Sequence, residues 1–67
     1  MQFYINSEEV TERTAVAYLT RYAMYKGYAQ ETAKEYMKNA RRSEEAREII
    51  SEMTDYTLEM ISYEGIF

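Results

Sequence analysis

Five acidic side chains in the C-terminal third of the chain recur at intervals that suit one side of a helix. They stand three, four, three and four residues apart: Glu45, Glu48, Glu52, Asp55 and Glu59. On a helix that rises 1.5 Å per residue, this spacing makes an acidic ridge about 21 Å long, with carboxylates roughly 5 Å apart along the axis. Like charges at these spacings cost a helix a few tenths of a kcal/mol each. The ridge therefore works against helix stability, which a purely structural surface would avoid.

Electrostatic docking is the chemistry that such a ridge suits. A regular line of negative charge resembles the edge of a nucleic-acid backbone, and long-range attraction speeds its approach to a basic protein surface. Phage-encoded inhibitors of restriction or CRISPR enzymes often work in this way. We therefore predict that the ridge and Tyr63 contact a basic, nucleic-acid-binding surface of a partner protein. The plainer interpretation is an acidic face that meets only solvent.

Catalysis and metal binding have little support in the composition. The chain contains neither histidine nor cysteine, so it has no imidazole base, no thiolate nucleophile and no metal ligand of either kind. Its serines have no histidine to activate them. With a single aspartate, the chain also cannot supply the spacing of a calcium-binding EF-hand loop. We expect no enzyme activity, no cofactor and no metal site.

A rival hypothesis concerns residues 30–42. Two helices joined by a short turn that contains Gly27 are compatible with a helix-turn-helix, whose second helix would face DNA with Gln30, Glu31, Lys34 and Lys38. Against this, the net charge of the chain is −4, whereas DNA-binding domains carry a basic footprint. We therefore do not expect direct nucleic-acid binding.

Tyrosine is unusually frequent, since eight of the ten aromatic residues are tyrosines. Several of them fall on helical faces that point toward the core or its rim: Tyr18, Tyr22, Tyr25 and Tyr36. Their hydroxyls either stay in contact with water or find polar partners, because a buried hydroxyl needs a hydrogen bond. Tyrosine is also common at interfaces. A third hypothesis is therefore a homodimer or larger homo-oligomer held by tyrosines and the apolar Ile66 and Phe67, with no link to nucleic acid.

The hydrophobic pattern predicts the elements that carry these residues. Apolar residues recur at helical spacing over residues 12–26, 30–42 and 44–62, with Thr11 and Ser43 as N-caps and Gly27 as a helix-ending glycine. Residues 2–10 favour a short β-strand or hairpin, because Phe3, Tyr4 and Ile5 precede a turn-prone Asn-Ser pair. The prediction is a mainly α single domain over residues 1–67, a small three-helix bundle with an N-terminal β element.

The helix predicted over residues 44–62 depends on a long apolar arc. The arc runs through Ile49, Ile50, Met53, Tyr56, Thr57, Met60 and Ile61, and only Leu58 falls in the middle of the opposite side. A strand over residues 56–63 would place Glu59 on one face with Ile61 and Tyr63. We therefore favour a single helix.

Charge is divided unevenly along the chain. Residues 1–42 contain five acidic and seven basic residues, whereas residues 43–67 contain seven acidic residues and one basic residue. The first nine residues lack the pattern of a signal peptide, and no apolar run approaches the ~20 residues of a membrane span. We therefore expect a cytoplasmic protein whose acidic end binds a basic partner.

Overall fold

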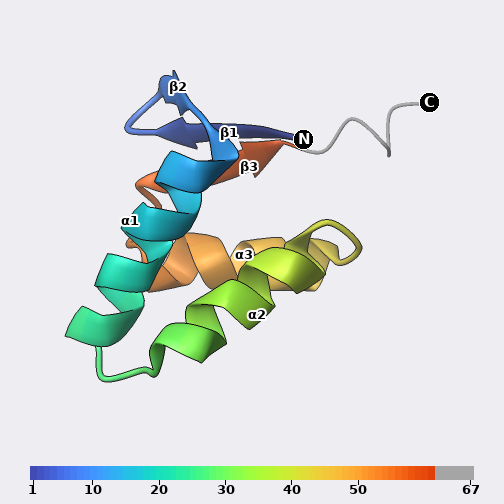
Figure 1. Ribbon diagram of the computed structural model, residues 1–67. Coiled ribbons are helices and arrows are strands. Elements are labelled where there is room, and N and C mark those ends of the chain that lie inside the picture. Colours follow the sequence, from blue (N-terminus) through green and yellow to red (C-terminus); the bar gives the residue numbers. More distant parts are fainter. Residues whose placement is uncertain (62–67) are drawn as a thin grey trace.

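A computed structural model describes residues 1–61, a mainly helical part of the chain with strands at both of its ends (Figure 1). The elements follow in the order β1 (Gln2–Ile5), β2 (Glu8–Val10), α1 (Glu12–Tyr25), α2 (Gln30–Ala40), α3 (Glu44–Met53) and β3 (Leu58–Ile61). The predicted three-helix arrangement with an N-terminal hairpin is confirmed. The second half of the third predicted helix is not, because it contains a turn and a strand.

The sheet has three antiparallel strands in the order β2-β1-β3, so the first strand of the chain lies in its centre. β1 and β2 are joined by Asn6 and Ser7, which both have positive φ, 51° and 69°. Two such residues are what a two-residue hairpin turn requires. Phe3 of β1 stands opposite Val10 on one side and Met60 on the other. This register places apolar side chains of all three strands on the face toward the helices.

The first two helices begin and end close to the predicted positions. The Thr11 hydroxyl accepts a hydrogen bond from the backbone N–H of Thr14 at 3.2 Å and caps α1. At the other end, Gly27 adopts φ 91° while the N–H of Tyr28 donates to the Ala23 carbonyl at 2.8 Å. This is the Schellman arrangement expected at a C′ glycine. α1 ends one residue, and α2 two residues, before the predicted limits.

The third helix ends at Met53, so the prediction of one helix over residues 44–62 is wrong. It begins as predicted, with the Ser43 hydroxyl accepting from the Ala46 N–H at 3.2 Å. It ends in a second Schellman arrangement, in which Asp55 and Tyr56 have φ 55° and 63° and the Tyr56 N–H donates to the Ser51 carbonyl at 2.6 Å. No glycine marks this position. An aspartate tolerates the left-handed region, but a tyrosine rarely adopts it.

Residues 58–61 form a strand, where the apolar spacing predicted the second half of a helix. β3 pairs with β1 from Gln2↔Ile61 to Ile5↔Leu58. Leu58 is fully buried, whereas Glu59 and Ile61 are exposed on the outer face of the sheet. Glu59 and Ile61 therefore share the outer face of this edge strand, which is the arrangement that counted against a strand in the sequence.

The core lies where α1 meets the sheet and the α2–α3 pair (Figure 1). Leu19, Ile50 and Leu58 are its largest fully buried hydrophobic side chains, one each from α1, α3 and β3. Small residues let the helices approach closely, and they are Ala15, Ala23, Ala33 and Ala40. One side of α3 therefore packs into this core, and the other side of the helix faces solvent.

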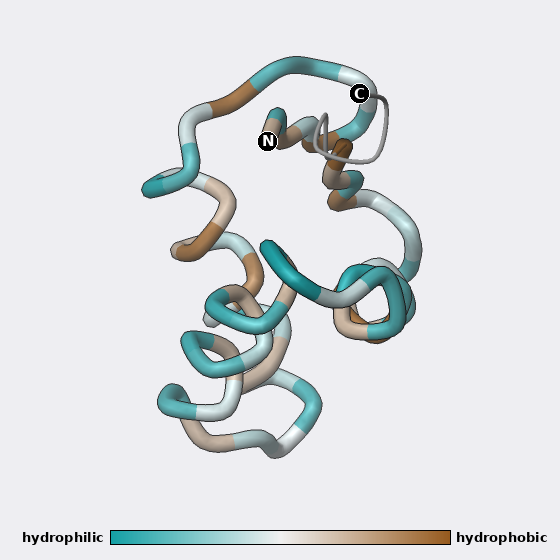
Figure 2. The backbone as a smooth tube through the Cα atoms, turned by 90° about the vertical axis from the view of Figure 1, so that its right-hand side faces the viewer, coloured by the Kyte–Doolittle hydropathy of each residue, from teal (hydrophilic) through white to brown (hydrophobic). Residues whose placement is uncertain are grey.

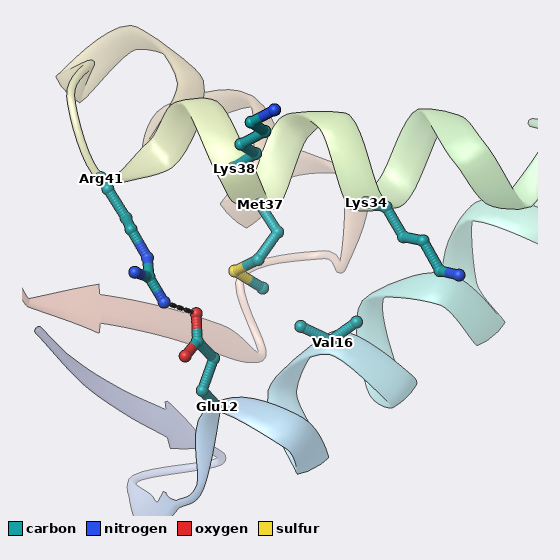
Figure 3. A pocket seen from close by; sticks show the side chains of 6 residues that line it. All are labelled: Glu12, Val16, Lys34, Met37, Lys38 and Arg41. Atoms are coloured by element: carbon teal, nitrogen blue, oxygen red, sulfur yellow. Dashed lines mark hydrogen bonds and ion pairs between the residues drawn. The ribbon is translucent and has the colours of Figure 1, made fainter.

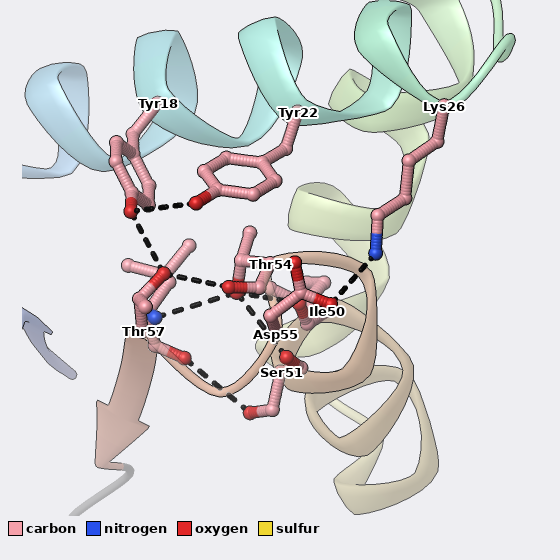
Figure 4. A network of polar contacts seen from close by, with 9 residues as sticks. Tyr18, Tyr22, Lys26, Ile50, Ser51, Thr54, Asp55 and Thr57 are labelled. Carbon is pink, nitrogen blue, oxygen red and sulfur yellow. Dashed lines mark hydrogen bonds and ion pairs between the residues drawn. The ribbon is translucent and has the colours of Figure 1, made fainter.

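A polar network joins α1 to the turn between α3 and β3 (Figure 4). The Tyr18 hydroxyl lies 2.7 Å from the Thr57 hydroxyl and 3.5 Å from that of Tyr22, and the two rings are 5.0 Å apart. The Thr57 hydroxyl donates to the Thr54 carbonyl at 2.6 Å. Tyr18 and Tyr22 thus lie at the rim of the core as predicted, and their hydroxyls find partners that link α1 to the end of α3. The same prediction is wrong for Tyr25, which is 88% exposed near the end of α1.

This network gives the stability of the protein a dependence on alkaline pH. The hydrogen bond with Tyr18, more than any other cause, raises the pKa of Tyr22 above its ordinary value of 10.0. The folded state therefore holds this proton more tightly than the unfolded chain does. The contribution of this bound proton to stability is fully present below pH 10 and is lost as the pH rises through the folded-state pKa of Tyr22. We expect the stability advantage of the wild type over Tyr22→Phe to shrink as the pH rises above 10 in urea unfolding, and a constant difference would contradict this.

Candidate functional site

The structure divides the five residues of the predicted acidic ridge among three settings. Glu45, Glu48 and Glu52 lie on α3, Asp55 lies in the turn that follows, and Glu59 lies on β3. A single ridge of five residues is therefore not formed, because the chain leaves the helix after Met53. Tyr63, the remaining predicted contact, lies outside the described residues.

The outer side of α3 retains a continuous acidic surface. At 100° per residue, four exposed glutamates fall within an arc of about 100°, and they are Glu44, Glu45, Glu48 and Glu52. We call them the acidic face. The single basic residue of α3, Arg47, lies at the flank and donates to the Ala40 carbonyl at 2.8 Å, where it caps α2. Within residues 1–61, no ion pair neutralises the acidic face.

Tyr56 belongs to this surface, although the sequence pattern assigned it to the core. Its side chain is 61% exposed. The loss of hydration around its hydroxyl, followed by the nearby carboxylates of Glu52 and Glu48, raises the pKa of Tyr56. The phenol therefore remains protonated at neutral pH and offers a hydrogen-bond donor and an apolar ring beside the glutamates. The missed signal was the run Thr54 to Thr57, whose residues are poor helix formers.

Asp55 lies in the turn after α3 and forms an ion pair there. Its carboxylate lies 3.0 Å from the Lys26 ammonium group and joins the end of α1 to the turn after α3 (Figure 4). Exposed ion pairs of this kind contribute at most about 1 kcal/mol. The Asp55 side chain remains 67% exposed in this ion pair, and its contact with a partner protein stays a prediction.

Glu59 faces solvent from a different surface. It pairs across the sheet with Tyr4, whose other neighbour is Glu9, so one row of the outer sheet face reads Glu9, Tyr4 and Glu59. Both glutamates are exposed. Glu59 is thus acidic and accessible as predicted, but it does not continue the line of carboxylates on α3.

Beside the acidic face, two shallow pockets of about 300 and 210 Å³ follow the boundary between α2 and α3. Both are lined by Tyr36 and Ile49, so together they form one α2–α3 groove with an apolar middle. One end reaches Glu45 and the other reaches Glu52. The groove therefore places apolar contact area directly next to two glutamates of the acidic face.

Among residues 1–61, no helix combines the length and apolar composition that crossing a membrane requires, and hydrophobic and hydrophilic residues are interspersed along the chain (Figure 2). In the same residues, no three carboxylates are grouped so that they could hold a metal ion. Comparisons with models of protein families, with curated proteins and with solved structures find no match.

Proposed function

We propose that this protein acts by binding another protein, with the acidic face of α3 docked on a basic surface of the kind that binds nucleic acid. The observation that supports this proposal best is the set of four exposed glutamates on one side of α3, with no cation among them. Occupying such a surface would make the protein a competitive inhibitor in the cytoplasm. The proposal needs no enzyme activity and no cofactor.

Electrostatics favours such a complex for a specific reason. Glutamates at i, i+3 and i, i+4 repel one another in the free helix, and a partner's lysines and arginines would relieve this repulsion. Opposite charge also raises the rate of encounter more than it raises final affinity. The complex is therefore expected to form rapidly at low salt and to weaken as salt rises.

The acidic face matches only a short stretch of nucleic acid. Glu45 and Glu52 are seven residues apart, which is about 10 Å along a helix axis. One DNA strand advances about 3.4 Å per phosphate, so the face spans about three phosphates. Apolar contacts must supply the remaining affinity, and Tyr56 and the α2–α3 groove are suited to this because exposed aromatic rings often carry interface energy.

Reversing the charge of Glu48 and Glu52 tests the proposal. We expect immobilised wild-type protein to retain a nucleic-acid-binding protein from a lysate of the source cell, and duplex DNA to displace it. The E48K/E52K variant should retain at least tenfold less, about 1.4 kcal/mol in binding free energy. The variant E8K/E9K makes the same change of charge on exposed β2 and should behave as the wild type. Equal retention by E48K/E52K, or a captured protein indifferent to DNA, would overturn the proposal.

The DNA-binding alternative predicts the opposite pattern. Neutralising Lys34, Lys38 and Arg41 would then abolish binding to duplex DNA, and E48K/E52K would strengthen it. Two observations weigh against this alternative: Glu31 and Glu35 are exposed on the same helix, and Arg41 is already paired with Glu12. A gel-shift series with both sets of variants separates the two hypotheses.

A further inference from the structure

A second charged surface borders the groove between α1 and α2 (Figure 3). The groove has a volume of about 320 Å³ and an apolar floor that includes Val16 and Met37. Three cations border it: Lys34 and Lys38 from one flank of α2, and Arg41, the C-cap residue of that helix. We call these three residues the basic edge. All three are exposed.

Part of the positive charge of the basic edge is not neutralised by other described residues. Arg41 reaches across the groove to the carboxylate of Glu12, and Met37 points toward Val16 (Figure 3). Among the described residues, neither Lys34 nor Lys38 takes part in an ion pair. Two ammonium groups thus stand beside an open groove with an apolar floor, a combination that fits an anionic partner with some apolar area.

The spacing of the basic edge is the mirror of the spacing of the acidic face. Lys34, Lys38 and Arg41 are four and then three residues apart, whereas the glutamates of α3 are three and then four apart. If the two helices run antiparallel, Lys34 meets Glu52 and Lys38 meets Glu48, while Arg41, which is paired with Glu12, lies opposite Glu45. The steps along both axes are then about 6 and 4.5 Å, so all three positions are in register.

We propose that the acidic face of one copy of this protein docks on the basic edge of another copy. The two surfaces belong to different helices, and each copy carries one of each, so the contact is head-to-tail and leaves both ends available. Growth then continues into a chain or closes into a ring. A second copy fits the groove better than nucleic acid does, because its glutamates match the spacing of the lysines, whereas Glu31 and Glu35 on α2 would repel phosphates.

The self-association is expected to be weak and sensitive to salt. Each exposed ion pair contributes at most about 1 kcal/mol, and the apolar floor of the groove adds a small area. At low salt, the average mass measured by sedimentation equilibrium should rise above the 8.0 kDa of one chain as concentration increases. Adding salt to 0.5 M should return it to that of a single chain, because the charges are then screened.

Two charge-reversed variants provide a sharp test. K34E/K38E loses the basic edge but keeps the acidic face, and E48K/E52K does the reverse. Each alone should remain a single chain, since neither has a complementary pair of surfaces. Mixed in equal amounts, they should associate again, because the acidic face of K34E/K38E meets the basic edge of E48K/E52K. Their two reversed surfaces also carry opposite charges, so association of the mixture should approach that of the wild type.

Matched controls keep the test independent of net charge and of folding. R13E/R21E and E8K/E9K make the same changes of charge on other exposed positions and should associate as the wild type does. Circular dichroism verifies that every variant is folded. A wild type that stays a single chain at low salt, or a mixture that does not associate, would overturn the proposal. So would binding of a 12-base-pair duplex that K34E/K38E abolishes, since the groove would then serve nucleic acid.

The proposal does not depend on the function proposed above, although both use the acidic face. K34E/K38E separates them: it should lose self-association and still capture the partner protein. If it captures the partner and the wild type never associates, only the self-association fails. If the wild type associates and E48K/E52K captures the same partner as before, only the proposed function fails.

Discussion

Replacing Leu58 with alanine is expected to lower the free energy of unfolding by about 2–5 kcal/mol, the usual cost of truncating a fully buried leucine. Leu58 is entirely buried between the sheet and the helices and stands opposite Ile5 in β1. A 67-residue domain has only a few kcal/mol of stability, so the variant should be partly or wholly unfolded at 25 °C. Urea unfolding monitored by circular dichroism measures the loss.

This substitution also distinguishes the strand from the continuous helix predicted by periodicity. On a helix over residues 44–62, Leu58 would face solvent and its truncation would change stability by no more than about 0.5 kcal/mol. Ile61→Ala is the matched control, because Ile61 lies on the same strand but is 41% exposed. Leu58→Ala should therefore be far more damaging than Ile61→Ala. Equal and small effects would contradict the presence of β3.

Replacing Thr54 with valine is expected to lower the free energy of unfolding by about 1–3 kcal/mol, the cost of leaving buried polar groups without partners. Thr54 is the one fully buried polar residue among residues 1–61. Its hydroxyl lies 3.1 Å from the Ile50 carbonyl, to which it donates, and accepts from the Leu58 N–H at 3.3 Å. Valine has the same shape but neither function, so the turn from α3 into β3 loses its internal support.

Thr54→Ser provides the comparison, because it keeps the hydroxyl and removes only a methyl group. Thermal unfolding should place the serine variant between the wild type and the valine variant. For a domain of this size, 1 kcal/mol corresponds to about 4–8 °C in Tm. A valine variant as stable as the wild type would contradict a contribution from these hydrogen bonds, and a serine variant less stable than the valine variant would show that packing of the methyl group matters more.

The elements with local signals could be predicted from the sequence. Thr11, Ser43 and Gly27 each make the cap that their residue type suggests, and Asn6 and Ser7 form the turn of the hairpin. These predictions succeed because a cap or a tight turn depends on a few neighbouring residues. The bounds of α1 and α2 follow from the same local chemistry.

The error in the third helix has a physical cause. The apolar spacing of residues 49–61 suits a helix, but the last four of these residues form β3, in which Leu58 is buried and Met60 is half-buried. What decides between the two is a tertiary interaction, the pairing of Leu58–Ile61 with a strand more than fifty residues earlier, and no local pattern reports such a pairing. Tyr56 in the left-handed region shows that this pairing overrides local preference, since such a conformation costs about 1–2 kcal/mol.

The candidate site was predicted only where the helix was predicted correctly. Glu45, Glu48 and Glu52 share a surface because α3 continues through them. Asp55 and Glu59 lie beyond its end, so the structure assigns them to a salt bridge and to the outer face of the sheet. Tyr56 lies beside the acidic face for the same reason. The turn after α3 keeps its ring out of the core and places it near Glu52.

The central position of β1 has a consequence for biosynthesis. During translation, β1 emerges first among the strands, whereas its partner β3 is among the last described residues to be made. The hairpin and α1 can form early, but one edge of β1 must wait for the rest of the chain, and an unpaired strand edge readily captures other strands. The ribosome-bound chain therefore presents an open sheet, and completion of the fold coincides with the end of synthesis of this region.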